Sequence, residues 1–199
     1  MGSKRKTVLR KSISAAAAGI FAAGILSACA NPQKEGTAAL EEGNYEEALA
    51  QFREAAESSD REKSAEGYRG LGMAYYESGE YGKALEAFQE AVDLGTEETV
   101  QLYHLMSVCG MQAWTDAEED EAVYTSVLEY IQTGLALAET GSGGDAPDAD
   151  MIREMKYNEI ICYEKLADWE NARQKADEYL SEYPDDEAVQ KEAEFLKTR

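Results

Sequence analysis

The sequence of 199 residues predicts an all-α protein that is built as a solenoid of stacked helical hairpins. Residues 68–94 carry apolar side chains that recur three and four positions apart in two stretches, and residues 78–80 provide a turn between them. The same pattern is found 36 residues earlier in the chain. A single hairpin cannot bury its apolar stripe alone, so the copies predict a stack in which each hairpin covers the next.

The N-terminal segment is predicted to direct export and not to join the fold. Residues 1–28 contain five basic residues and no acidic ones, and an apolar run follows the basic part. That run has about 16 residues, whereas a membrane-spanning helix needs about 20. The run leads to the four residues Leu26, Ser27, Ala28 and Cys29.

These four residues resemble the lipobox of bacterial lipoproteins. The resemblance implies that residues 1–28 are a lipoprotein signal peptide and that Cys29 receives a diacylglyceryl anchor of the palmitate type. Residues 29–31 would then be a short tether that holds the protein on the outward face of a bacterial cell membrane, or on the periplasmic face of the outer membrane in a diderm host. An ordinary secretory signal cut near Ala28 and an uncleaved short anchor remain as alternatives. Ala30 does not distinguish a monoderm from a diderm host.

The charge of the chain excludes some classes of partner. The sequence has 40 acidic and 19 basic residues, a net charge of −21. Without the first 28 residues, 14 basic residues stand against 40 acidic ones, and the net charge is −26. This balance argues against nucleic-acid binding, which requires neutralisation of phosphates, and against lying flat on an anionic membrane. It is compatible with a basic partner, although solubility is the better explanation.

The first two hairpins match each other closely. Their spacing and composition resemble the tetratricopeptide repeat (TPR), a helix–turn–helix unit of about 34 residues. The resemblance implies a right-handed α-solenoid over residues 32–199, with the first two repeats at about 32–60 and 65–96. The matching pairs are Gly36 and Gly72, Gly43 and Gly79, Tyr45 and Tyr81, Ala48 and Ala84, Phe52 and Phe88, and Ala55 and Ala91.

Two further repeats are predicted at about residues 99–140 and 151–184, followed by a capping helix at 185–199. A spacing of 34 places Leu102, Leu105, Met106 and Cys109 where the second repeat has Tyr68, Leu71, Gly72 and Tyr75. An acidic insert, residues 116–121, precedes the second helix of this third repeat, in which Gly134 holds the small-residue position and predicts close packing. The fourth repeat has Ala167 in the turn where glycine stood before, and Pro184 at its end.

The resemblance also implies a ligand groove. In the family, the first helices of the repeats line a concave surface, and a few of their positions commonly reach a bound peptide. The mixture of Tyr, Met and Arg at those positions suits peptide capture. A clamp for a C-terminal carboxylate is absent, because its Lys and Asn positions hold other residues. The candidate groove residues are Arg69, Met73, Tyr76, Tyr103, Ser107, Met111, Tyr157 and Ile161.

Catalytic and metal-binding motifs are not evident, so we expect no enzyme activity, no cofactor and no metal site. His104 has no nucleophile at a motif spacing. The acidic insert and the residues Asp145, Asp148 and Asp150 lack the spacing of a calcium loop and are better explained as solvated loops. Cys109 and Cys162 are expected to be buried free thiols, with a disulfide left open as the alternative.

The sequence therefore predicts a membrane-anchored, non-catalytic interaction module that binds a peptide or protein partner in the groove of its repeats. Two alternatives remain open. One is a structural subunit of an envelope assembly or secretion complex. The other is a metal-binding or cell-wall-active accessory protein that acts through the acidic insert.

Overall fold

The computed structural model describes residues 31–113, 121–142 and 146–199. Within the sequence, Asn31–Arg199 forms a compact unit that is separate from Met1–Ala30. The predicted signal peptide, the lipobox and Cys29 therefore lie outside the described residues, as does most of the acidic insert. In the described part of the chain, no helix is long and apolar enough to cross a membrane.

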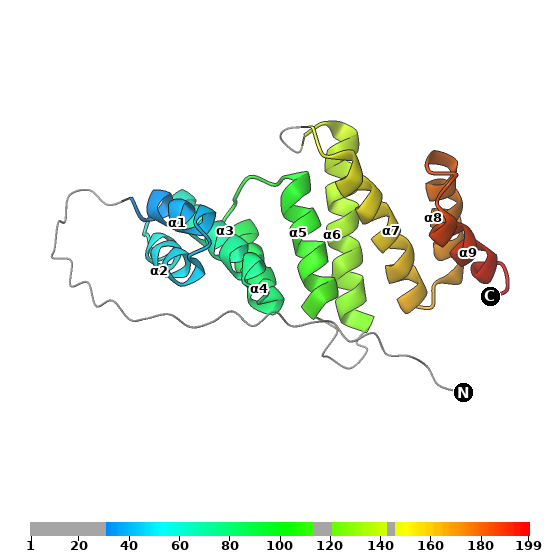
Figure 1. The fold of residues 1–199 in the computed structure, drawn as a ribbon, viewed down its shortest axis with the longest axis horizontal. Helices are drawn as coiled ribbons and strands as arrows, with labels where there is room; N and C mark the ends of the chain where they lie inside the picture. The colour runs from blue at the N-terminus through cyan, green and yellow to red at the C-terminus, as the bar shows by residue number, and fades with distance from the viewer. Residues whose placement is uncertain (1–30, 114–120, 143–145) are drawn as a thin grey trace. The chain divides into compact units, whose positions relative to one another are not determined.

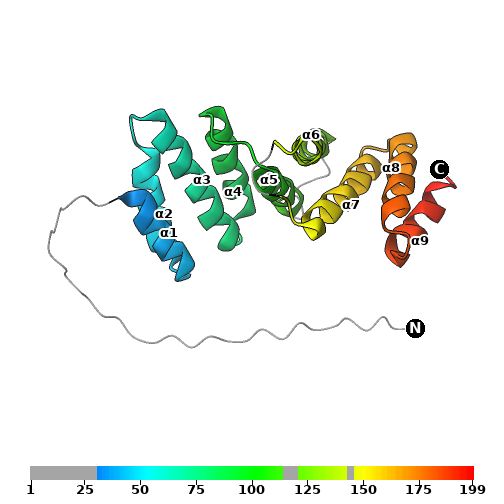
Figure 2. The ribbon, with the colours of Figure 1, turned by 90° about the horizontal axis from the view of Figure 1, so that it is seen from above.

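The described residues form nine helices and no strand, which confirms the predicted all-α class (Figure 1). Each helix packs against the next one in the chain, and α1 also contacts α3, as α5 contacts α7. Figures 1 and 2 show that the helices follow one another along the stack in chain order. The helices are α1 (Pro32–Glu41), α2 (Tyr45–Ala56), α3 (Arg61–Glu77), α4 (Tyr81–Asp93), α5 (Val100–Ala113), α6 (Glu121–Thr140), α7 (Ala149–Lys165), α8 (Trp169–Glu182) and α9 (Glu187–Leu196).

The turns inside three hairpins share one backbone conformation. Gly43 and Gly79 have φ values of 73° and 79°, and Ala167 takes the same place in the fourth hairpin with a φ of 54°. This left-handed conformation suits glycine, whereas the Cβ of alanine crowds the next carbonyl. The prediction that Ala167 replaces a turn glycine is therefore confirmed, and the replacement has an energetic cost.

Glycine also allows the helices of the first two hairpins to approach closely. Phe52 and Phe88 are buried, and glycines face their rings. A Cβ built on Gly36 would lie 2.8 Å from Cδ1 of Phe52, and one built on Gly72 would lie 2.9 Å from Cγ of Phe88. Gly134 of α6 is buried as well, and a Cβ there would lie 3.1 Å from Cβ of Tyr103. The predicted close packing at Gly134 is confirmed.

The α5 helix has a different register from the one that the spacing predicted. Buried positions of α3 recur in α7 at a spacing of 88, and the same positions recur in α5 at a spacing of 35. The predicted spacing of 34 is therefore wrong by one residue. In the observed register, Cys109 takes the place of Ala74, and Gly110 takes the place of Tyr75. The residues of α5 that correspond to Arg69, Met73 and Tyr76 are His104, Val108 and Met111.

Candidate binding surfaces

A hollow of about 420 Å³ lies on the side of the stack formed by the first helices of the hairpins. We call it the first-helix hollow. Arg69 and Met73 of α3 line it, and α5 contributes Leu102 and Leu105. Pro147, which precedes α7, and Met151 of α7 also line it. Its lining combines the guanidinium of Arg69, the carboxylates of Glu97 and Asp148, and apolar and thioether side chains, a set that suits an extended peptide with mixed side chains.

Three of the predicted groove residues belong to α3. Arg69 is exposed and Met73 is half-buried, and the structure brings these two together in the first-helix hollow. Tyr76 is half-buried, and its ring meets the ring of Tyr81 edge-on with 5.8 Å between the centroids. Burial is the main reason why the pKa of Tyr76 is raised. Tyr76 therefore presents only part of its ring to a ligand.

The structure does not place Tyr103 and Ser107 on the first-helix side, where the prediction put them. Ser107 is fully buried and donates a hydrogen bond of 2.7 Å to the carbonyl of His104. Tyr103 is also buried, on the opposite side of α5, where its hydroxyl donates to Glu98 over 2.8 Å. Burial and this hydrogen bond raise the pKa of Tyr103 to about 12. The error arises because the observed register of α5 differs by one residue from the predicted register.

His104 and Val108 take the places that Tyr103 and Ser107 were expected to hold. Both are half-buried. Nε2 of His104 lies 3.0 Å from Oε2 of Glu154, so a hydrogen bond links α5 to α7 across the first-helix side. The lone histidine therefore has a structural partner. No pattern in the sequence singled out Val108.

The remaining predicted groove residues lie further along the stack. Met111 packs beside the cluster that contains Val127, Ile131 and Met155, and Ile161 is half-buried. The ring of Tyr157 meets the ring of Tyr179 edge-on, at 6.5 Å between centroids.

Tyr157 lines a separate hollow of about 430 Å³. There Asp186 accepts hydrogen bonds from Arg153 at 2.8 Å and from Tyr179 at 2.9 Å, and these lower its pKa to about 2. This carboxylate links α9 to the last hairpin.

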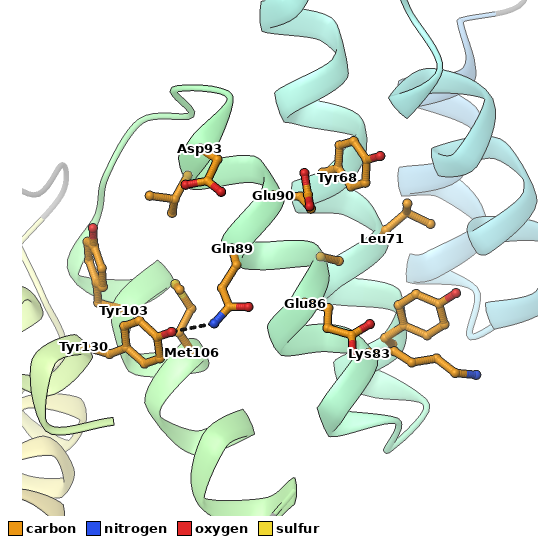
Figure 3. Close-up of a pocket in the computed structure, with 13 residues that line it drawn as sticks. Tyr68, Leu71, Lys83, Glu86, Gln89, Glu90, Asp93, Tyr103, Met106 and Tyr130 are labelled. Atoms are coloured by element: carbon orange, nitrogen blue, oxygen red, sulfur yellow. Dashed lines mark hydrogen bonds between the residues drawn. The ribbon is translucent and has the colours of Figure 1, made fainter. Parts of the chain in front are cut away.

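A larger hollow, of about 940 Å³, opens on the side formed by the second helices α4 and α6 (Figure 3). We call it the second-helix hollow. Buried Leu71 and Met106 lie at its base. Tyr68 and Tyr130 lie on either side of α4, and Glu90 lies beside Tyr68. The sequence did not indicate this surface, because the family resemblance implies ligand contacts on the first helices alone.

The two cysteines are buried free thiols in separate apolar clusters, as expected. Burial raises the pKa of Cys109 and that of Cys162 to about 12, which makes both thiols unreactive. Among the described residues, no group of three potential ligands could hold a metal ion. Asp148 caps α7 by accepting a hydrogen bond from the amide of Asp150 at 2.8 Å. Asp145 lies outside the described residues.

Comparison with known proteins identifies the repeats. Residues 34–98 and 157–186 each match a family model described as tetratricopeptide repeat, and the third hairpin lies between the two matched stretches. The chain therefore carries tetratricopeptide repeats, and its fold is a TPR-like solenoid. None of the curated proteins is significantly similar to it.

Solved structures share this fold. The chain is similar to YrrB, described as a TPR protein with an unusual peptide-binding site, with a TM-score of 0.64 and 17% identity over 84% of this chain and 75% of that chain. It is also similar to MamA, with a TM-score of 0.61 and 13% identity over 83% of this chain and 78% of that chain. At these identities the likeness concerns the fold alone.

Proposed function

We propose that this protein is a non-catalytic interaction module that binds a peptide or protein segment on its first-helix side. The observation that carries the proposal is the first-helix hollow, in which Arg69 and Met73 meet Leu105 and the segment before α7. Peptide binding by TPR proteins, including the site in the description of YrrB, supports this choice. The affinity would come from apolar contacts at the base and from polar contacts with Arg69 at the edge.

We further propose that Cys29 carries a diacylglyceryl anchor and that the module faces outward from a bacterial membrane. The lipobox-like residues 26–29 support this part. Two acyl chains provide stable attachment, whereas one chain gives only reversible binding. The short tether would keep the first hairpin near the bilayer, while the net charge of −26 keeps the rest of the chain away from anionic lipid.

Photocrosslinking tests the binding side. A photoreactive amino acid at Met73 or Val108 should crosslink one discrete partner in a bacterial host, because both positions lie on the first-helix side. The matched control carries the same amino acid at Ala50, which is exposed on α2. Equal crosslinking from Ala50, or none from either test position, would contradict the proposed site.

Metabolic labelling with a palmitate analogue tests the anchor. The wild-type chain should incorporate the label and partition with membranes, and Cys29→Ser should lose both properties. Cys109→Ser is the matched control and should keep them, since Cys109 is buried. Retention of the label in Cys29→Ser would rule out the proposed anchor while leaving the binding side untouched.

A further inference from the structure

On the second-helix side, a hydrogen bond to a tyrosine hydroxyl joins neighbouring hairpins at two places. Arg53 of α2 donates a hydrogen bond to the hydroxyl of Tyr75 in α3 at 3.3 Å. Gln132 of α6 donates to the hydroxyl of Tyr163 in α7 at 2.9 Å. Tyr75 and Tyr163 hold equivalent positions in their repeats, so the first and last junctions are closed in the same way.

The middle junction is closed differently. Gly110 stands in α5 where Tyr75 and Tyr163 stand in α3 and α7, and it has no side chain to offer. Gln89, which is equivalent to Arg53, donates instead to the hydroxyl of Tyr130, which comes from α6, at 2.6 Å (Figure 3). The missing side chain at position 110 leaves Tyr103, Met106 and Tyr130 to line one half of the second-helix hollow.

The chemistry of the second-helix hollow favours a cationic ligand. Exposed Glu86 and Glu90 lie at its edge, and no basic side chain of the described residues lies within salt-bridge distance of either. Among the described residues that line it, Lys83 alone is basic, and it pairs with Glu80.

The half-buried rings of Tyr68 and Tyr130 provide the aromatic faces over which cations are attracted. The chain already uses this interaction once within the hollow, because the ammonium of Lys83 lies 5.4 Å from the centre of the Tyr75 ring.

We propose that the second-helix hollow docks a basic segment of a protein partner. Its Arg or Lys side chains would pair with Glu86 and Glu90 and lie over the tyrosine rings, and its apolar side chains would contact Leu71 and Met106. The net charge of −21 attracts such a segment from a distance, and the unpaired carboxylates fix where it docks. This site lies on the second helices and is separate from the first-helix hollow, so one module can hold two segments at once.

Fluorescence polarisation with a defined probe tests this docking site. The probe is a fluorescein-labelled octapeptide of alternating Arg and Ala, titrated with the detergent-solubilised full chain. We expect binding that Glu86→Gln/Glu90→Gln weakens at least five-fold. Glu41→Gln/Glu42→Gln removes the same charge at the end of α1 and should change the affinity less than two-fold. The same peptide with Glu in place of Arg should not bind.

A second variant separates ring contacts from charge. Tyr68→Leu keeps an apolar side chain and removes the aromatic face, and we expect a two- to five-fold loss of affinity for the Arg peptide. If Glu86→Gln/Glu90→Gln and Glu41→Gln/Glu42→Gln weakened the affinity for the Arg peptide equally, the binding would be diffuse attraction to an acidic protein. That result would overturn the proposal. Absence of measurable binding to the wild-type chain would overturn it too.

Discussion

The junction between the first two hairpins and the junction between the last two both contain a buried glycine, but on opposite helices of the contact. At the α2–α3 junction, Gly67 lies against the backbone of Ala55 and Ala56, where a Cβ would lie 2.7 Å from the carbonyl carbon of Ala55. At the α6–α7 junction, Met155 holds the place of Gly67, and Gly134 holds the place of Ala55. The position on the first helix of the next hairpin is thus Gly67 in α3 and the large Met155 in α7, and in α6 glycine replaces the alanine of α2.

The glycine of each pair therefore lies on a different helix, on α3 at the first junction and on α6 at the second. The two junctions differ in what opposes the glycine. Backbone opposes Gly67 and cannot move, whereas the flexible end of Met155 is among the atoms closest to Gly134. Substitutions at equivalent places should therefore have unequal effects.

The largest effect is expected for Gly67→Ala. Its new methyl group would overlap the backbone of α2, so the helices must separate, and we expect a loss of about 3 kcal/mol in unfolding free energy. Urea unfolding followed by circular dichroism provides the measurement. Gly82→Ala on the exposed side of α4 is the control, since no atom lies within 4 Å of the new Cβ. A loss no larger than that of the control would show that the α2–α3 contact is not tight.

Gly134→Ala should cost less than Gly67→Ala. Met155 can move its terminal methyl group aside, and alanine gains helix propensity of about 1 kcal/mol over glycine. The contact with Tyr103 still opposes the change, so we expect a net loss of about 1 kcal/mol in the same urea experiment. Adding Met155→Ala to Gly134→Ala should cost less than Met155→Ala does alone. Strict additivity would contradict direct contact between these two positions.

The hairpin turns extend the comparison to the backbone. Ala167→Gly should stabilise the chain by about 0.5 kcal/mol, because glycine adopts positive φ without crowding. Gly79→Ala, in the equivalent turn of the second hairpin, should destabilise it by a similar amount. Thermal unfolding of both variants measures the pair, and a change of the same sign in both would contradict this explanation.

A pH-dependent effect near neutral pH is expected from the last hairpin. Burial, together with the neighbouring carboxyl of Glu192, raises the pKa of Glu164 in α7 to about 7. A carboxyl with a higher pKa in the folded chain stabilises the fold while protonated, and this stability is lost as the pH rises through 7. The melting temperature should therefore fall between pH 6 and pH 8, and less so in Glu164→Gln. An equal fall in the variant would assign the effect to other groups.

The sequence allowed the prediction of the helical hairpins, of the tight packing at Gly134 and of the unusual turn at Ala167. Each of these depends on contrast between small, large and polar residues at fixed spacing. The register of α5 was not predictable in the same way, because nearly all residues from Val100 to Gly110 are small or apolar. With so little polar contrast, two registers that differ by one residue fit the pattern equally well.

The same ambiguity affected the prediction of the residues that form the candidate surfaces. Arg69 and Met73 do lie together in the first-helix hollow, and the register of α3 agrees with the predicted one. Tyr103 and Ser107 were misplaced with α5. To predict the second-helix hollow, one would have to know that Tyr130 of α6 contacts Gln89 of α4. The spacing of residues within one repeat does not reveal such a contact. One signal in the sequence could have indicated this hollow. The position that holds Tyr75 in α3 and Tyr163 in α7 holds Gly110 in α5.

The register of α5 is the central claim, since the positions of both candidate surfaces depend on it. Maleimide labelling of single cysteines in the folded full chain tests it directly, in a background where Cys109 and Cys162 are replaced by alanine. Val108→Cys should react readily, and Ser107→Cys should be protected until the chain is unfolded. Equal protection of the two thiols, or faster reaction at position 107, would contradict the observed register and with it the placement of both surfaces.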